Sequence, residues 1–92
     1  MKFMISWKLG PGHHKPAGEL FLKSGAPMPD GLKMIGRWHA PGSVSGWVLV
    51  EGEDLKALYE HIAQWANQLD LQATPVLEDS DAAQALTKVY GK

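Results

Sequence analysis

The chain has 92 residues, a net charge of −1 and no cysteine. This length suits one domain over residues 1–92, and a near-zero charge without a basic run argues against binding to nucleic acid or to an anionic membrane. The absence of cysteine excludes a disulfide scaffold, a thiolate zinc site and a cysteine nucleophile. Lys8 interrupts the apolar start, and no apolar stretch reaches the roughly 20 residues of a membrane span. We therefore expect a cytoplasmic protein.

The hydrophobic pattern predicts four strands and three helices. Period-two runs bounded by Gly and Pro are typical of strands, which we expect at residues 2–9, 32–40, 44–52 and 71–77. Apolar residues three and four positions apart are typical of helices, which we expect at residues 14–24, 55–69 and 79–90. Gly25 suits the end of the first helix, and Asp54 suits the N-cap of the second.

This order of elements predicts an α+β fold of the ferredoxin-like class, β-α-β-β-α-β with a C-terminal helix. In that fold two helices cover one face of a four-stranded antiparallel sheet. If the turn pairs His39 with Val44, strand alternation puts Arg37 and His39 on the same face as Gly46 and Val48. We expect this face to meet the helices.

The opposite face of the two central strands carries large apolar side chains as well. Trp38 lies there near Trp47, and Gly36 makes room beside Trp47. Helices of one copy cover only one face, and an open face with two tryptophans exceeds what soluble monomers usually expose. We therefore expect a homodimer in which two copies pack sheet to sheet, because a two-fold homodimer is the commonest form of oligomer.

The chain also resembles a known family. The string Gly36-Arg37-Trp38-His39, the strand 46–51, the helix around Trp65 and the string Thr74-Pro75-Val76 are similar to a small bacterial family of unknown function within the dimeric α/β-barrel superfamily. The resemblance implies a barrel of two four-stranded sheets with a ligand cavity. Relatives in that superfamily include cofactor-independent monooxygenases, muconolactone isomerases and haem-binding enzymes. Their catalytic residues differ between subfamilies, so the resemblance assigns no reaction.

Arg37 is the first candidate site residue, because a permanent cation in the middle of a strand needs a partner. Gly46, expected opposite, would leave room for its side chain. One interpretation is an anchor for a carboxylate or enolate of a ligand. The other is a structural ion pair with an acid of a partner subunit or of this chain, namely Glu51, Glu53 or Glu78.

Two of the four histidines are candidates for proton transfer. His39 shares its strand face with Arg37, and an imidazole titrates near neutral pH. His13 precedes a helix, where the exposed N–H groups favour anions, but His13 and His14 also suit a surface loop. Together with His61 they show no spacing typical of a metal site. We therefore expect neither a metal nor another cofactor.

The four tryptophans have two interpretations as well. Trp7, Trp38 and Trp47 either line an aromatic ligand pocket or fill the dimer core. Trp65 and Tyr59 lie on the apolar stripe of the second helix, and we expect both in the hydrophobic core.

These features leave three functions open. The first is a homodimeric module that binds a small anionic or aromatic molecule, with Arg37, Trp7, Trp38 and Trp47 as binding residues. The second is a small cofactor-independent enzyme, in which Arg37 holds an anionic substrate and His39 or His13 transfers a proton. The third is a purely structural or interaction dimer. We favour the binding module, because no tuned acid–base pair is visible in the sequence.

Overall fold

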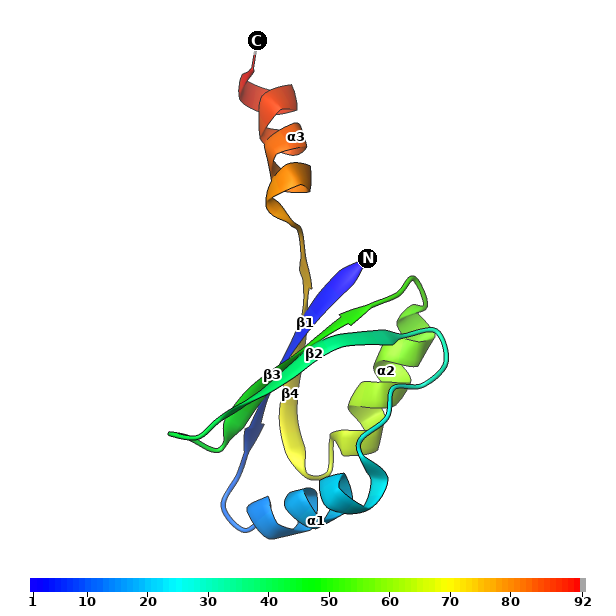
Figure 1. Ribbon diagram of the computed structural model, residues 1–92, viewed down its shortest axis with the longest axis vertical. Coiled ribbons are helices and arrows are strands. Elements are labelled where there is room, and N and C mark those ends of the chain that lie inside the picture. Colours follow the sequence, from blue (N-terminus) through cyan, green and yellow to red (C-terminus); the bar gives the residue numbers. More distant parts are fainter. Residues whose placement is uncertain (92) are drawn as a thin grey trace.

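A computed structural model describes residues 1–91 of the chain. It consists of a four-stranded antiparallel sheet, two helices on one face of the sheet, and a third helix that extends away from this body (Figure 1). The elements in chain order are β1 (Lys2–Leu9), α1 (His14–Ser24), β2 (Lys33–Ala40), β3 (Ser45–Glu51), α2 (Leu55–Trp65), β4 (Leu69–Val76) and α3 (Asp79–Tyr90).

The strand order is β2-β3-β1-β4. β1 lies between β3 and β4 and pairs with both in antiparallel fashion, and β2 pairs with the outer side of β3. Each half of the chain thus contributes one central strand and one edge strand, with one helix packed on the sheet. This arrangement confirms the predicted ferredoxin-like α+β fold. No helix among residues 1–91 is both long and apolar enough to cross a membrane.

The predicted start of α2 is confirmed, but its predicted end is wrong. The Asp54 carboxylate accepts hydrogen bonds from the backbone N–H groups of Lys56 and Ala57, at 2.9 and 3.2 Å, so it caps the helix. The helix ends at Trp65, and Leu69, expected in the helix, is the first residue of β4. Leu69 pairs with Leu9 in the sheet, a contact that the helical spacing of the sequence did not reveal.

The core lies between the sheet and α2. Its buried cluster consists of Phe3, Ile5, Val48, Val50 and Leu58. The predicted assignment of the valine face to the helices is therefore confirmed.

The expectation that Trp65 and Tyr59 both enter the core is only half right. Trp65 is buried with an exposed fraction of 8%, whereas Tyr59 is 76% exposed. The buried face of α2 is formed by Ala57, Leu58, His61 and Trp65. Tyr59 is displaced from this face by the 3.6-residue period of the helix.

The register of the β2–β3 turn differs from the expected one by two residues. His39 pairs with Gly46, and Arg37 lies opposite Val48 and not opposite Gly46. Val44 stays outside the strand, where its carbonyl accepts a hydrogen bond of 2.9 Å from the N–H of Leu9. Because this shift is an even number, the side chains of residues 36–40 keep their predicted faces. A bulge between Met34 and Gly36 changes the register by one residue, so Met34 lies opposite Val50 and the alternation from Gly36 to Ala40 does not extend to it.

Two strand glycines make room for tryptophan rings. A methyl group on Gly46 would overlap the indole of Trp7 and lie 2.5 Å from the carbonyl oxygen of Trp38. A methyl group on Gly36 would lie 2.6 Å from the ring of Trp38. The expectation that Gly36 makes room beside Trp47 is therefore wrong. Gly36 pairs with Leu49, and the ring that it accommodates is that of Trp38.

α3 has no contact surface in the body of the protein. None of its residues is buried, and Leu86, Val89 and Tyr90 are 56%, 62% and 79% exposed. It gives the molecule a radius of gyration of 15.7 Å, whereas a compact chain of this length has about 12 Å. An isolated helix of about 12 residues is only marginally stable in water, and the body of the protein adds little packing to α3.

The contact between Gly46 and Trp7 generates the first testable prediction. Gly46→Ala should lower the free energy of unfolding by about 1–3 kcal/mol, because the new methyl group overlaps an indole and a backbone carbonyl. Urea denaturation followed by circular dichroism measures this change. The matched control is Gly42→Ala, where a methyl group meets nothing within 4 Å. Equal stabilities of the two variants would contradict the proposed role of Gly46.

Candidate functional site

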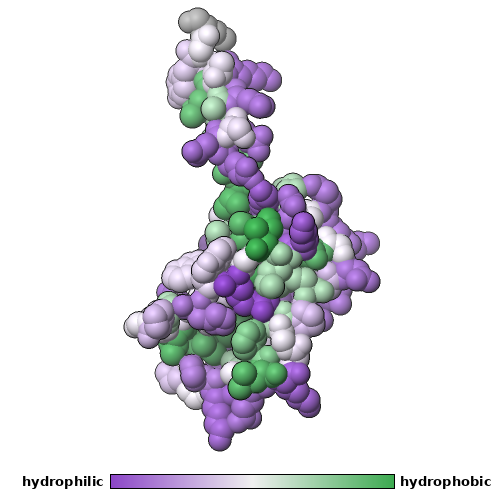
Figure 2. Space-filling model, in the orientation of Figure 1, coloured by the Kyte–Doolittle hydropathy of each residue, from purple (hydrophilic) through white to green (hydrophobic). Residues whose placement is uncertain are grey.

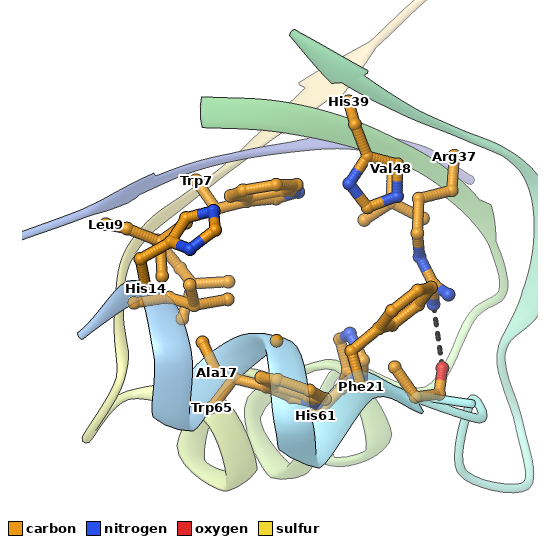
Figure 3. Close-up of a pocket in the computed structure, with 14 residues that line it drawn as sticks. Trp7, Leu9, His14, Ala17, Phe21, Arg37, His39, Val48, His61 and Trp65 are labelled. Atoms are coloured by element: carbon orange, nitrogen blue, oxygen red, sulfur yellow. Dashed lines mark hydrogen bonds between the residues drawn. The ribbon is translucent and has the colours of Figure 1, made fainter. Parts of the chain in front are cut away.

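A cavity of about 160 Å³ lies between α1 and the helix-covered face of the sheet (Figure 3). Its four charged or imidazole lining residues come from three elements that are distant in sequence. They are His14 of α1, Arg37 and His39 of β2, and His61 of α2. The rest of the lining is aromatic and aliphatic, with Trp7, Phe21, Trp65, Leu69 and Leu71 as its largest members. No Asp or Glu is among these lining residues, so the side chains that line the cavity favour an anion.

Arg37 is held at the cavity by the end of α1. Gly25 ends that helix in the left-handed conformation with φ 73°, and Ala26 follows with φ 44°. This turn directs two backbone carbonyls toward the guanidinium. Arg37 Nη2 donates to the Ala26 oxygen at 2.7 Å (dashed in Figure 3), and Nη1 donates to the Gly25 oxygen at 3.4 Å. The guanidinium carbon also lies 5.5 Å from the centre of the Phe21 ring, within the range of a cation–π contact.

Arg37 has no carboxylate partner within residues 1–91. Two of the acids considered as ion-pair partners are engaged elsewhere: Glu53 pairs with the amino group of Met1, and Glu78 pairs with Lys2. Burial lowers the pKa of Arg37, but a guanidinium remains protonated at neutral pH. The cavity therefore contains a half-buried positive charge that is balanced only by carbonyl dipoles.

His39 stands beside Arg37 and is oriented by aromatic rings. Its ring centre is 5.4 Å from that of Trp7 in an edge-to-face arrangement and 5.5 Å from that of Phe21. These contacts follow from the sheet, because Gly46, the partner of His39, leaves the space into which Trp7 extends. The predicted proximity of Arg37 and His39 on one strand face is confirmed, and both line the cavity.

His61 is the residue that the sequence analysis missed. It lies on the buried face of α2 with an exposed fraction of 4%, and its Nδ1 atom has no hydrogen-bond partner among residues 1–91. Burial lowers its pKa, and the positive charge of Arg37 lowers it further. A polar residue on the apolar stripe of a helix, between Leu58 and Trp65, was the signal that could have identified it.

Three candidate residues do not line the cavity. His13 is the N-cap residue of α1, where its Nδ1 lies 3.2 Å from the Gln68 side-chain oxygen; its neighbour His14 lines the cavity instead. Trp38 and Trp47 lie on the opposite face of the sheet, where they are 52% and 43% exposed. Of the four candidate binding residues, the structure brings only Arg37 and Trp7 to the cavity.

The described part of the chain contains no group of three His, Asp or Glu side chains arranged to hold a metal ion. The chemistry available at the cavity is therefore that of one guanidinium, three imidazoles and an aromatic wall. Such a set can bind an anion, orient a planar ring and accept or donate a proton.

Comparisons with known proteins gave one match. The family described as "Domain of unknown function (DUF3303)" matches residues 1–90. Searches of curated proteins and of solved structures found no match.

The lowered pKa of His61 predicts a pH dependence of stability. Below its ordinary pKa of 6.5, His61 takes up a proton in the unfolded chain but remains neutral in the folded protein. The free energy of unfolding should therefore decrease as the pH falls below about 6.5. The contribution of His61 to this decrease should be absent in His61→Phe. Urea denaturation between about pH 5 and 7.5 measures both slopes. His14→Phe, which removes an exposed imidazole at the same cavity, is the control. Parallel curves for wild type and His61→Phe would contradict this prediction.

Proposed function

Because the chain belongs to the DUF3303 family, whose description names no activity, we propose a function from the geometry of the cavity alone. The protein is a homodimeric module that binds a small aromatic carboxylate between α1 and the sheet. Arg37 anchors the carboxylate, and the aromatic wall holds the ring.

The observation that carries this proposal is the unpaired guanidinium at the cavity. A guanidinium has five N–H donors, and the carbonyls of Gly25 and Ala26 occupy two of them, which leaves three. Partial burial of a cation without an anion is unfavourable, whereas an arginine and a carboxylate form two parallel charge-assisted hydrogen bonds. A carboxylate is therefore the group that completes the hydrogen bonds of Arg37.

The size and lining of the cavity support a single aromatic ring. A cavity of about 150 Å³ with apolar walls accepts a benzene-sized molecule, and this cavity measures about 160 Å³. Trp7, Phe21 and His39 present ring faces and edges at neighbouring positions of its wall. Aromatic groups arranged in this way favour a planar ligand over an aliphatic one of the same volume.

A cofactor-independent enzyme is the second candidate function. It is favoured by His39, whose imidazole lines the same cavity as Arg37. In such an enzyme Arg37 holds an anionic substrate, and His39 transfers the proton. His13, the other residue proposed for this role, is directed toward Gln68 and does not line the cavity. Conversion of a bound ligand by wild type but not by His39→Gln, with equal affinity, would favour the enzyme over the binding module.

Two exposed apolar surfaces support the sheet-to-sheet homodimer. The face of the sheet opposite the helices exposes Trp38 and Trp47. α3 exposes Leu86, Val89 and Tyr90, and Figure 2 shows hydrophobic groups along α3 and beside the point where it leaves the body. One copy covers neither surface, and a two-fold axis that stacks two open faces removes both tryptophans from water. This is also the arrangement of the dimeric α/β barrels that the chain resembles. A structural dimer without a ligand is the remaining alternative.

The role of Arg37 can be tested with benzoate and benzamide, which differ in charge but hardly in shape. Isothermal titration should show that wild type binds benzoate and not benzamide, and that Arg37→Gln binds benzoate at least about tenfold more weakly, because it lacks the charge-assisted hydrogen bonds. Lys33→Gln removes an exposed charge from the same strand and should leave the affinity unchanged. Equal benzoate affinities of wild type and Arg37→Gln would refute the anchor.

The dimer predicts a mass of about 20 kDa in light scattering, twice the 10.1 kDa of one chain. Exchanging both Trp38 and Trp47 for Asp should reduce this mass to that of one chain, because like charges then face each other across the two-fold axis. Tyr59→Asp places the same charge at an exposed aromatic residue on α2 and should remain a dimer. A wild-type mass of one chain would exclude the homodimer.

A further inference from the structure

The Nδ1 atom of His61 is the one buried side-chain polar atom without a hydrogen-bond partner among residues 1–91. Buried polar atoms are almost always hydrogen-bonded in native proteins, because an unpaired one has lost its hydrogen bonds to water without replacement. His61 lies on α2, and its side chain forms part of the cavity wall on the side opposite Trp7 (Figure 3). The nitrogen itself is closed off from solvent, so a group in the cavity pairs with it only by moving the side chains that cover it.

The surroundings of His61 limit the charge of that partner. The imidazole is 96% buried, from an exposed fraction of 4%, and the cation of Arg37 acts on it. Both effects favour the neutral ring, which carries one N–H donor and one acceptor nitrogen. A second carboxylate on the ligand would meet an uncharged imidazole, and an ammonium group would be repelled by Arg37. Both are less suitable than an uncharged group.

A hydroxyl group fits this position better than other uncharged groups. It donates and accepts, so it can bond to Nδ1 in either tautomer of the ring. It also adds little volume to an aromatic carboxylate in a cavity of about 160 Å³. The arrangement across the cavity is then complementary, with a carboxylate at Arg37 and a hydroxyl at His61.

We propose that His61 recognises a hydroxyl group on the bound ligand, and that the ligand class is the hydroxy-substituted aromatic carboxylic acids. This inference rests on the proposed function, since it requires a carboxylate at Arg37. It assigns to His61 a specificity role that is separate from the anchoring role of Arg37.

The test compares benzoate with its three monohydroxy derivatives by isothermal titration. At least one hydroxybenzoate should bind to wild type about tenfold or more tightly than benzoate, since the site's buried nitrogen is paired only in that complex. In His61→Phe, which keeps a ring of similar size, this preference should disappear while the benzoate affinity stays within about threefold. Tyr59→Phe, which removes the hydroxyl of an exposed residue on the same helix and outside the cavity, should keep the preference.

The outcomes separate this inference from the proposed function. If benzoate and all three hydroxybenzoates bind to wild type with the same affinity, or if His61→Phe keeps the preference, the role of His61 is refuted while the carboxylate site stands. If neither benzoate nor any hydroxybenzoate binds, the proposed function fails, and this inference fails with it.

A second readout uses the unaltered protein, so that it does not depend on the folding of a variant. In nitrogen-15 NMR spectra of the imidazole rings, the preferred hydroxybenzoate should shift the Nδ1 resonance of His61 strongly, and benzoate should shift it little. Equal shifts with both ligands would overturn the inference.

Discussion

The positive charge of Arg37 is the constraint on which the site depends. A strand that is covered by helices normally carries aliphatic side chains at such a position, and a guanidinium there needs hydrogen bonds as well as space. The left-handed end of α1 supplies two carbonyls, and Phe21 supplies a ring. Because neither carries a negative charge, the structure leaves Arg37 able to bind an anion. If a carboxylate of the same chain stood in place of these carbonyls, it would neutralise Arg37, and the arginine would form a structural ion pair.

The cavity beside Arg37 arises from the packing of a tryptophan on a glycine. Trp7 occupies the space that any side chain at position 46 would fill, and its ring meets His39 edge to face. This contact holds the aromatic wall against the sheet, while α1 and α2 close the other side. Core, cavity and candidate site therefore share one layer between sheet and helices, and residues that affect the site also affect stability.

The other side of the sheet has a different role. Trp38 lies over Gly36. The two helices that pack on the sheet cover the other face (Figure 1). Strand alternation thus separates the string 36–39 into two functions: Arg37 and His39 line the cavity, and Gly36 and Trp38 belong to the open face. The extended α3, with its exposed apolar residues, is the second surface on which the proposed dimer rests.

The sequence by itself determined the order of the elements and the faces of most strand residues, because both depend on local periodicity; the bulge at Met34 and the boundary between α2 and β4 do not. It predicted β1 and α1 with their observed bounds and placed Arg37 next to His39. The tertiary structure alone decided the register of the β2–β3 turn, the carbonyl partners of Arg37 and the entry of His61 into the site. These features depend on contacts between residues far apart in the chain, such as the hydrogen bond from Leu9 to Val44, and helical or strand spacing carries no information about them. His61 illustrates the difference, since its spacing marks only a buried position, and its place beside Arg37 at the cavity follows from the packing of α2 on the sheet.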